Sequence, residues 1–210
     1  MSSIPASIRS EAGQTVAYRI DDRLYLNITD RCTLACTFCP KTQGSFGLHE
    51  YDLALDHRPE FDEIVAAIDD PTAYTEVVFC GYGEPTLRLD LLLEVARWIK
   101  ARGGRVRVNT DGLASLANKR DVLPEMAGLV DAISVSLNAQ SPNVYNHHCQ
   151  PALPGAYQAM LAFLQQAPRY IPEVTATAID GLEEVDIAAC ERLARMCGAK
   201  FRRRVLDVVG

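Results

Sequence analysis

The chain has 210 residues and a formal net charge of -6; 48% of the residues are hydrophobic and 23% are charged, as in an ordinary globular protein. The negative charge argues against a general nucleic-acid binder, because such binding rests on a basic surface. No stretch approaches the roughly 20 apolar residues that a membrane helix needs, and residues 1–18 contain no signal-like apolar run, so we expect a cytoplasmic protein with no membrane partner. Seven cysteines, three clustered and four scattered, do not form a secreted disulfide framework.

The first chemical signal is a triplet of thiols, Cys32, Cys36 and Cys39, which follows an apolar, strand-like run over residues 24–29. A structural zinc site closes its tetrahedron with four ligands, and the nearest downstream candidate is His49. A four-iron four-sulfur cluster held by three thiolates leaves one iron open for a substrate or cofactor. The spacing therefore indicates an iron–sulfur centre, with a zinc knuckle or a buried thiol cluster as alternatives.

Beyond this triplet the chain alternates between helix-like and strand-like patterns. Residues 40–56 contain glycine and lack periodicity, which is typical of a loop that covers the centre. The predicted strands are 24–29, 75–80, 105–109, 131–138, 172–179 and 200–208. The predicted helices are 61–68, the segment between Asp90 and Gly103, 113–129 with a break at Pro124, 155–167 and 186–197.

Each connection between these strands is long enough for parallel pairing with a right-handed crossover. The pattern therefore predicts an α/β fold in which six strand–helix units form a partial parallel barrel. We assign residues 23–210 to this domain and 1–22 to an N-terminal extension. In such a barrel the chemistry lies at the C-terminal ends of the strands.

Polar residues gather at these strand ends. The second strand ends in the motif Tyr82-Gly83-Glu84-Pro85. Glycine there permits close backbone approach and Glu84 can accept hydrogen bonds, although a simple turn is the alternative. Asn109 ends the third strand, and the fourth has a small, polar face that ends with Ser136 and Asn138. Because sealed barrels fill this layer with branched apolar residues, we expect a cavity, with satisfied core polar groups as the alternative.

The scattered thiols fall into two groups. Cys149 is predicted in a loop above the barrel, where it could serve as a thiol hydrogen donor or a ligand, or be an incidental loop residue. Cys190 and Cys197 lie on the apolar stripe of the last helix and Cys80 at a strand end, so all three are predicted to be core residues.

Three consecutive arginines, Arg202, Arg203 and Arg204, occupy the last predicted strand. Side chains alternate along a strand, so Arg203 points away from its two neighbours and one or two of the three could face the barrel. A guanidinium there could bind a phosphate or a carboxylate. A solvated edge strand is the alternative.

The cysteine triplet with an aromatic residue, Phe38, before its last member resembles the cluster loop of the radical S-adenosylmethionine (SAM) enzymes. The motif at 82–85 resembles that family's Gly-Gly-Glu-Pro, and residues 177–184 resemble its GxIxGxxE stretch with Thr177 in place of the first glycine. The resemblance implies that the triplet holds one four-iron four-sulfur cluster whose open iron chelates SAM. It also implies cofactor contacts from Phe38, Tyr82, Gly83, Glu84, Pro85, Asn109, Ser136, Asn138 and Ile179.

The resemblance further implies an enzyme that reductively cleaves SAM and uses the 5'-deoxyadenosyl radical on an unknown, small substrate, with an electron donor such as flavodoxin or ferredoxin. We expect that substrate to enter beside Ser136, Asn138 and Arg203, under Cys149. The short chain, its 24–29 opening and its 81–87 signature look most like the small TatD-associated radical SAM proteins, which implies a link to a TatD-type hydrolase. The 7-carboxy-7-deazaguanine synthases and the glycyl-radical activating enzymes are competing assignments. A non-catalytic zinc or iron–sulfur binding module is the alternative from another class.

Overall fold

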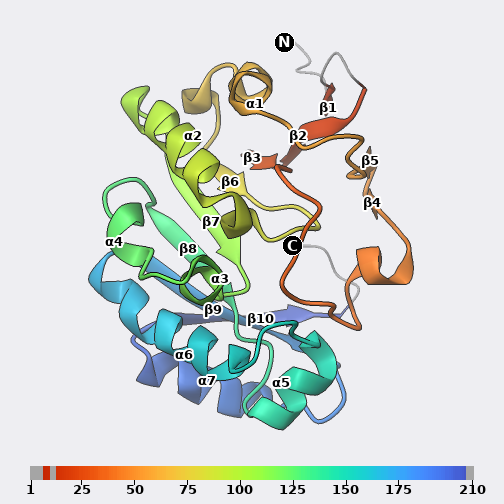
Figure 1. Cartoon of the computed structure of the whole chain (residues 1–210), viewed down its shortest axis with the longest axis vertical. Coiled ribbons are helices and arrows are strands. Elements are labelled where there is room, and N and C mark those ends of the chain that lie inside the picture. Colours follow the sequence, from red (N-terminus) through yellow and green to blue (C-terminus); the bar gives the residue numbers. More distant parts are fainter. Residues whose placement is uncertain (1–6, 10–12, 207–210) are drawn as a thin grey trace.

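The computed structural model describes residues 7–9 and 13–206, and its centre is one eight-stranded sheet (Figure 1). The strands are β1 (Ser7–Arg9), β2 (Thr15–Ile20), β3 (Arg23–Leu26), β6 (Glu76–Phe79), β7 (Val106–Thr110), β8 (Ala132–Ser136), β9 (Glu173–Asp180) and β10 (Lys200–Val205), in the order β1-β2-β3-β6-β7-β8-β9-β10. All pairs from β3 to β10 are parallel, so the predicted α/β fold with six parallel strands is confirmed. The barrel is open, because β1 and β10 form the two edges.

The first two strands pair antiparallel and were not predicted. β2 runs against β3 through the turn at Asp21 and Asp22, and Asp21 adopts a positive φ of 54° there. Three consecutive residues of β2, Val16, Ala17 and Tyr18, are almost fully buried. Residues 15–20, left in an N-terminal extension by the sequence prediction, are thus the second strand of the sheet.

Helices cover one face of the sheet. They are α1 (Phe61–Ile68), α2 (Leu89–Ala101), α3 (Ala114–Asn118), α4 (Leu123–Met126), α5 (Pro142–Cys149), α6 (Ala156–Gln166) and α7 (Ile187–Met196). Short 3-10 turns lie at Pro40–Gln43 (η1), Pro71–Ala73 (η2), Pro85–Arg88 (η3) and Ala167–Arg169 (η4). The expected loop over 40–56 contains η1 and a small hairpin, β4 (Gly47–Leu48) with β5 (Tyr51–Asp52). Among the described residues, no helix has both the length and the apolar character needed to cross a bilayer.

Alternation along the strands separates the core from the barrel interior. In β8, Ile133 and Val135 belong to the hydrophobic core beneath the helices, whereas Ser134 and Ser136 point to the other face. The small, polar inner face that the sequence predicted for this strand is therefore present.

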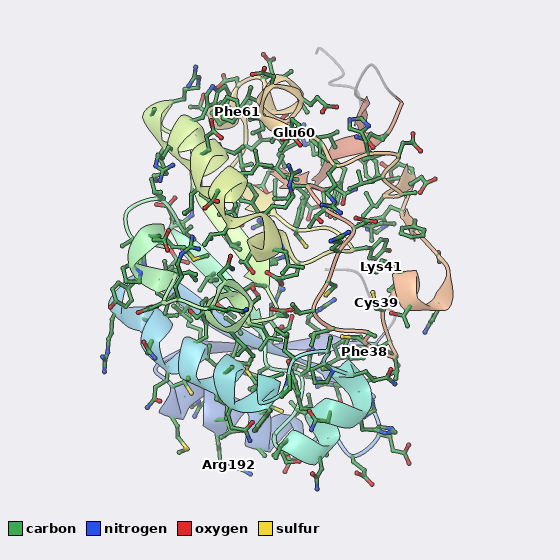
Figure 2. The ribbon with its side chains drawn as sticks, in the orientation of Figure 1. Phe38, Cys39, Lys41, Glu60, Phe61 and Arg192 are labelled. Carbon is green, nitrogen blue, oxygen red and sulfur yellow. The ribbon has the colours of Figure 1, made fainter. Side chains whose placement is uncertain are left out.

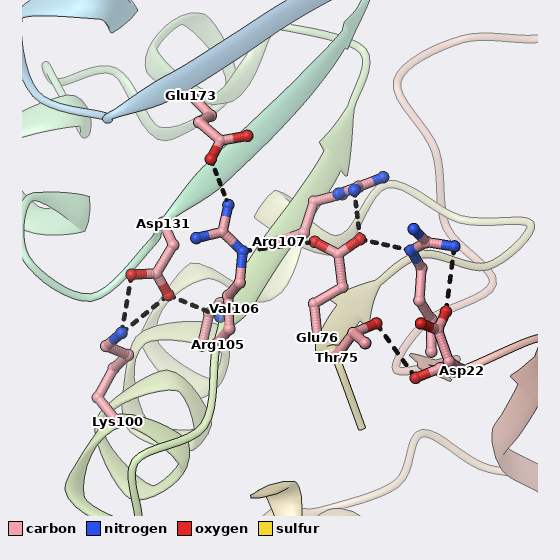
Figure 3. Close-up of polar contacts among 10 residues, drawn as sticks. Asp22, Thr75, Glu76, Lys100, Arg105, Val106, Arg107, Asp131 and Glu173 are labelled. Carbon is pink, nitrogen blue, oxygen red and sulfur yellow. Dashed lines mark hydrogen bonds and ion pairs between the residues drawn. The ribbon is translucent and has the colours of Figure 1, made fainter. Parts of the chain in front are cut away.

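Ion pairs close the N-terminal end of the barrel interior (Figure 3). Glu76 is only 4% exposed, and its carboxylate accepts from Arg23 Nε at 2.7 Å and from Arg107. Arg105 lies 3.9 Å from the same carboxylate and pairs with Glu173 at 2.7 Å. A buried carboxylate needs such partners to offset its desolvation. The groups free to meet a ligand are therefore those nearer the C-terminal strand ends.

Candidate functional site

The cysteine loop follows β3 and docks on the end of α5. The Ala35 amide donates to the Cys149 carbonyl at 3.1 Å, and the Thr37 amide donates to the His148 carbonyl at 2.8 Å. These bonds join the cysteine loop to a helix end that lies more than one hundred residues later in the sequence. Each of the three predicted ligands, Cys32, Cys36 and Cys39, is half-buried. In Figure 2, Phe38 and Cys39 lie close to Lys41 at the start of η1.

The residues just before the cysteine triplet cross the Tyr82–Pro85 motif, which follows β6, in van der Waals contact. A Cβ at Gly83 would lie 2.2 Å from the carbonyl oxygen of Thr29 and 2.7 Å from that of Arg31. The next residue, Glu84, donates its amide to the Arg31 carbonyl at 2.7 Å. The close backbone approach predicted at this glycine is therefore present, and here it serves the cysteine loop.

The Glu84 side chain is 3% exposed and accepts only internal hydrogen bonds. Its donors are the Thr86 amide at 3.0 Å, the Thr86 hydroxyl at 2.5 Å, the Thr110 hydroxyl at 2.8 Å and the Asp111 amide at 2.7 Å. The Asp111 carboxylate accepts in turn from the Thr33 hydroxyl, between two cysteines. This chain of bonds ties the ends of β6 and β7 to the cysteine loop. It makes Glu84 a positioning residue, and its predicted contact with SAM stays a prediction.

Burial of two neighbouring carboxyl groups shifts their proton affinity. Burial, and then the charge of Asp111, raise the pKa of Glu84 to about 8, and burial also raises the pKa of Asp111. At neutral pH this pair therefore favours sharing a proton over carrying two full charges.

Two amides at the strand ends have buried oxygens without a hydrogen-bond partner, Asn109 Oδ1 and Asn138 Oδ1. Asn138 adopts a left-handed backbone conformation with a φ of 58°. Its backbone N–H donates to the Thr177 carbonyl at 3.0 Å, which holds this turn in place. Buried acceptors of this kind are rare in folded proteins. They match a ligand that brings donors, and SAM carries an ammonium group and ribose hydroxyls. These two acceptors, on two predicted contact residues, thus fit the donors of the implied cofactor.

The remaining predicted contact residues lie at three places. Ile179 is buried at the end of β9 and Ser136 is half-buried at the end of β8, so both lie at the strand-end mouth. Pro85 is the buried first residue of η3. Tyr82 instead turns outward: its hydroxyl donates to the Gly47 carbonyl at 2.7 Å and its ring meets Phe46 edge-on. The cofactor roles of these residues stay predictions.

Cys149 is not in a loop, as the sequence predicted, but is the last residue of α5 and fully buried. Its thiol hydrogen-bonds with that of Cys36, which lowers the pKa of Cys149 and raises that of Cys36, and it accepts from Asn138 Nδ2 at 3.5 Å. The helix α5 was not predicted because its amphipathic pattern is weak. Ser141 followed by Pro142 was the available signal, since these residue types favour the N-cap and the first helical position.

Two further expectations need correction. Cys190 is a core residue as predicted, and Cys197 packs against the core, but Cys80 is half-buried and lies outside the core cluster. Arg203 was expected at the mouth, yet it pairs with Asp180. In both cases the register between strands decides which face a side chain takes, and the sequence alone does not fix it.

Within residues 7–9 and 13–206, no three His, Cys, Asp or Glu side chains converge tightly enough to hold a single ion. The joint ligation of one cluster by the cysteine triplet therefore stays a prediction.

Comparison with known proteins identifies relatives. The model of the radical SAM superfamily matches residues 26–197. GTP 3',8-cyclase of Limosilactobacillus fermentum is 37% identical over 131 residues, which are 60% of this chain and 36% of that protein. The dual-specificity RNA methyltransferase RlmN of Halorhodospira halophila is 26% identical over 190 residues, 80% of this chain and 47% of that protein. The chain spans less than half the length of these two relatives.

A solved structure shows the same fold. Streptococcus suis SuiB bound to S-adenosylmethionine has a TM-score of 0.66 over 91% of this chain and 42% of its own, at 12% identity. The superfamily match begins inside β3, includes the cysteine loop and the Glu84 motif, and covers far more than half of the sequence. Members of that superfamily use a four-iron four-sulfur cluster and SAM, so the predicted recognition is confirmed at this level. The chain belongs to the radical SAM superfamily.

Proposed function

We propose that this protein is a radical SAM enzyme in which Cys32, Cys36 and Cys39 hold one four-iron four-sulfur cluster. When bound and reduced, the cluster would supply the electron that cleaves SAM to methionine and the 5'-deoxyadenosyl radical. The observation that carries the proposal is the pair of buried, unpartnered amide oxygens of Asn109 and Asn138, at the strand ends that flank the docked cysteine loop.

The residues of the chain have separable tasks in this proposal. The cysteine loop presents the thiols, and its docking on α5 and on the 83–84 backbone fixes its path. Asn109 and Asn138 accept hydrogen bonds from the ammonium group or hydroxyls of SAM. Glu84 orders the motif around them through Thr86, Thr110 and Asp111.

The test is anaerobic purification followed by iron, sulfide and zinc analysis, with 5'-deoxyadenosine measured after adding SAM and dithionite. We expect about four irons per chain and release of 5'-deoxyadenosine. Cys32→Ala, Cys36→Ala and Cys39→Ala should each lose the cluster, whereas Cys190→Ala, a core thiol on α7, should keep it. Zinc without iron would instead support the non-catalytic binding module, and full iron in all three loop variants would show that the cysteine assignment is wrong.

The finer assignments are also proposals. The 24–29 and 81–87 segments support a TatD-associated protein with a functional link to a TatD-type hydrolase. We also propose a flavodoxin or ferredoxin as electron donor and a cytoplasmic location. The two relatives, a GTP cyclase and an RNA methyltransferase, differ in activity, so they do not indicate which substrate this chain takes. We propose a small substrate that enters at the strand ends, with Cys149 behind the cysteine loop as a candidate hydrogen donor.

A further inference from the structure

We propose that the barrel interior binds an anionic group of the substrate, a phosphate or a carboxylate, through the guanidinium groups of Arg202 and Arg204. This inference rests on the proposed function, because it names the class of substrate that the same site would accept. It is carried by the register of β10, by the absence of ion-pair partners for the two arginines among the described residues, and by the polar residues next to them.

The register of β10 against β9 decides where the arginines point. Arg203 pairs with Ala178, which is fully buried in the core beneath the helices, so Arg203 lies on the helix side and binds Asp180. Arg202 and Arg204 pair with Thr177 and Ile179, which face the barrel interior. Residues paired across a parallel sheet share a face, so both guanidinium groups belong to the interior.

Arg202 is exposed at the open side of the barrel and Arg204 is half-buried, and the surroundings of Arg202 agree with this register. Burial lowers its pKa first, and the positive charges of Arg204 and Arg107 lower it further. Tyr25 and Cys80, from β3 and the end of β6, are also close enough to affect it. Three guanidinium groups therefore gather in one interior region that is lined by strands from both halves of the sheet.

Among the residues that the structure describes, only one of these three arginines has a carboxylate partner. Arg107 binds Glu76 at the closed end. In the part of the chain that the structure describes, Arg202 and Arg204 have neither an ion pair within 4.0 Å nor a side-chain hydrogen bond, and the Nε of Arg204 is buried without a partner. Positive charges held close together without an anion repel each other, and the buried Nε of Arg204 lacks both water and a protein acceptor. A bound anion would remove both costs.

Neighbouring side chains suit the same ligand. Arg202 on β10 pairs with Thr177 on β9, and Thr177 pairs with Ser136 on β8. Two hydroxyl side chains therefore lie beside this guanidinium in one row across three strands. The planar fork of arginine matches the oxygens of a phosphate or carboxylate. The site therefore fits a small molecule that carries at least one such group, and it disfavours a neutral or cationic substrate.

The test is titration calorimetry on the anaerobically reconstituted protein with SAM present, at constant ionic strength. The probes are inorganic phosphate, succinate and the uncharged succinamide. We expect phosphate or succinate to bind and succinamide not to bind, and the two anions distinguish a phosphate site from a carboxylate site. The double variant R202Q/R204Q should bind the anion about tenfold more weakly or worse.

The matched control is R203Q, which removes the same charge from the same strand on its other face, and it should bind the anion within about twofold of wild type. Iron content and melting temperature establish that the double variant is folded. The inference is overturned if neither anion binds to wild type, if the double variant binds as well as wild type, or if R203Q weakens binding equally. Release of 5'-deoxyadenosine by wild type without substrate tests the proposed function separately, so the two failures are distinguishable.

Discussion

Replacing Glu84 by Ala should destabilise the folded protein strongly. The carboxylate is the acceptor for two backbone amides, those of Thr86 and Asp111, which cannot turn toward other acceptors as the Thr86 and Thr110 hydroxyls can. A buried donor left without a partner costs about 1–3 kcal/mol, so we expect a loss of about 2–6 kcal/mol in the free energy of unfolding.

The measurement is urea unfolding of the metal-free protein under reducing conditions, followed by circular dichroism. The control is Glu191→Ala, since that carboxylate is 42% exposed in a pair with Arg195 and should change the free energy by only about 0.5 kcal/mol. A loss below about 1 kcal/mol in Glu84→Ala would refute the positioning role. SAM affinity, measured on folded and reconstituted Glu84→Gln, then asks separately whether this side chain also contacts the cofactor.

Three other predictions address the pH dependence, the loop crossing and the cofactor contact. The pKa of Glu84 is about 8 in the folded protein, whereas the unfolded chain releases this proton near the ordinary value of 4.5. The free energy of unfolding should therefore fall as pH rises from about 5 to 8. Glu84→Gln should flatten that slope, and an unchanged slope would contradict the assignment. Gly83→Ala should reduce iron incorporation, because its Cβ would displace the Thr29 carbonyl just before the cysteine loop; normal iron content after reconstitution would show that the crossing can relax. Asn138→Ala should weaken SAM binding about two- to tenfold by equilibrium dialysis and leave iron unchanged, whereas equal affinity would exclude its amide from the site.

Much of the architecture could be predicted because its signals are local. Buried parallel strands appear as short apolar runs, and the helices between them carry a clear period, so the six parallel strands were found within a few residues of their bounds. The cysteine spacing and the Glu84 motif were placed correctly at the ends of adjacent strands for the same reason.

The features that were missed depend on tertiary contacts. β2 is recognisable only through its pairing with β3, and α5 has little amphipathic pattern of its own. The inward direction of Arg202 and Arg204 follows from the register with β9, where a shift by one residue would reverse every side chain. Two of the four donors to the Glu84 carboxylate, the Thr110 hydroxyl and the Asp111 amide, likewise come from a strand end about 26 residues away.

The cysteine loop is held at three places, and each anchor comes from a different part of the sheet. The 83–84 backbone after β6 contacts Thr29 and Arg31, Asp111 after β7 accepts from Thr33, and the end of α5 after β8 binds Ala35 and Thr37. Two of the anchors meet in the Glu84 carboxylate, which accepts from the Asp111 amide. The backbone of residues 83–84 thus positions the cysteine loop, while the side chain of Glu84 orders the end of β7. A change at Glu84 should therefore disturb the loop through Asp111 and Thr33, even where it touches neither cluster nor cofactor.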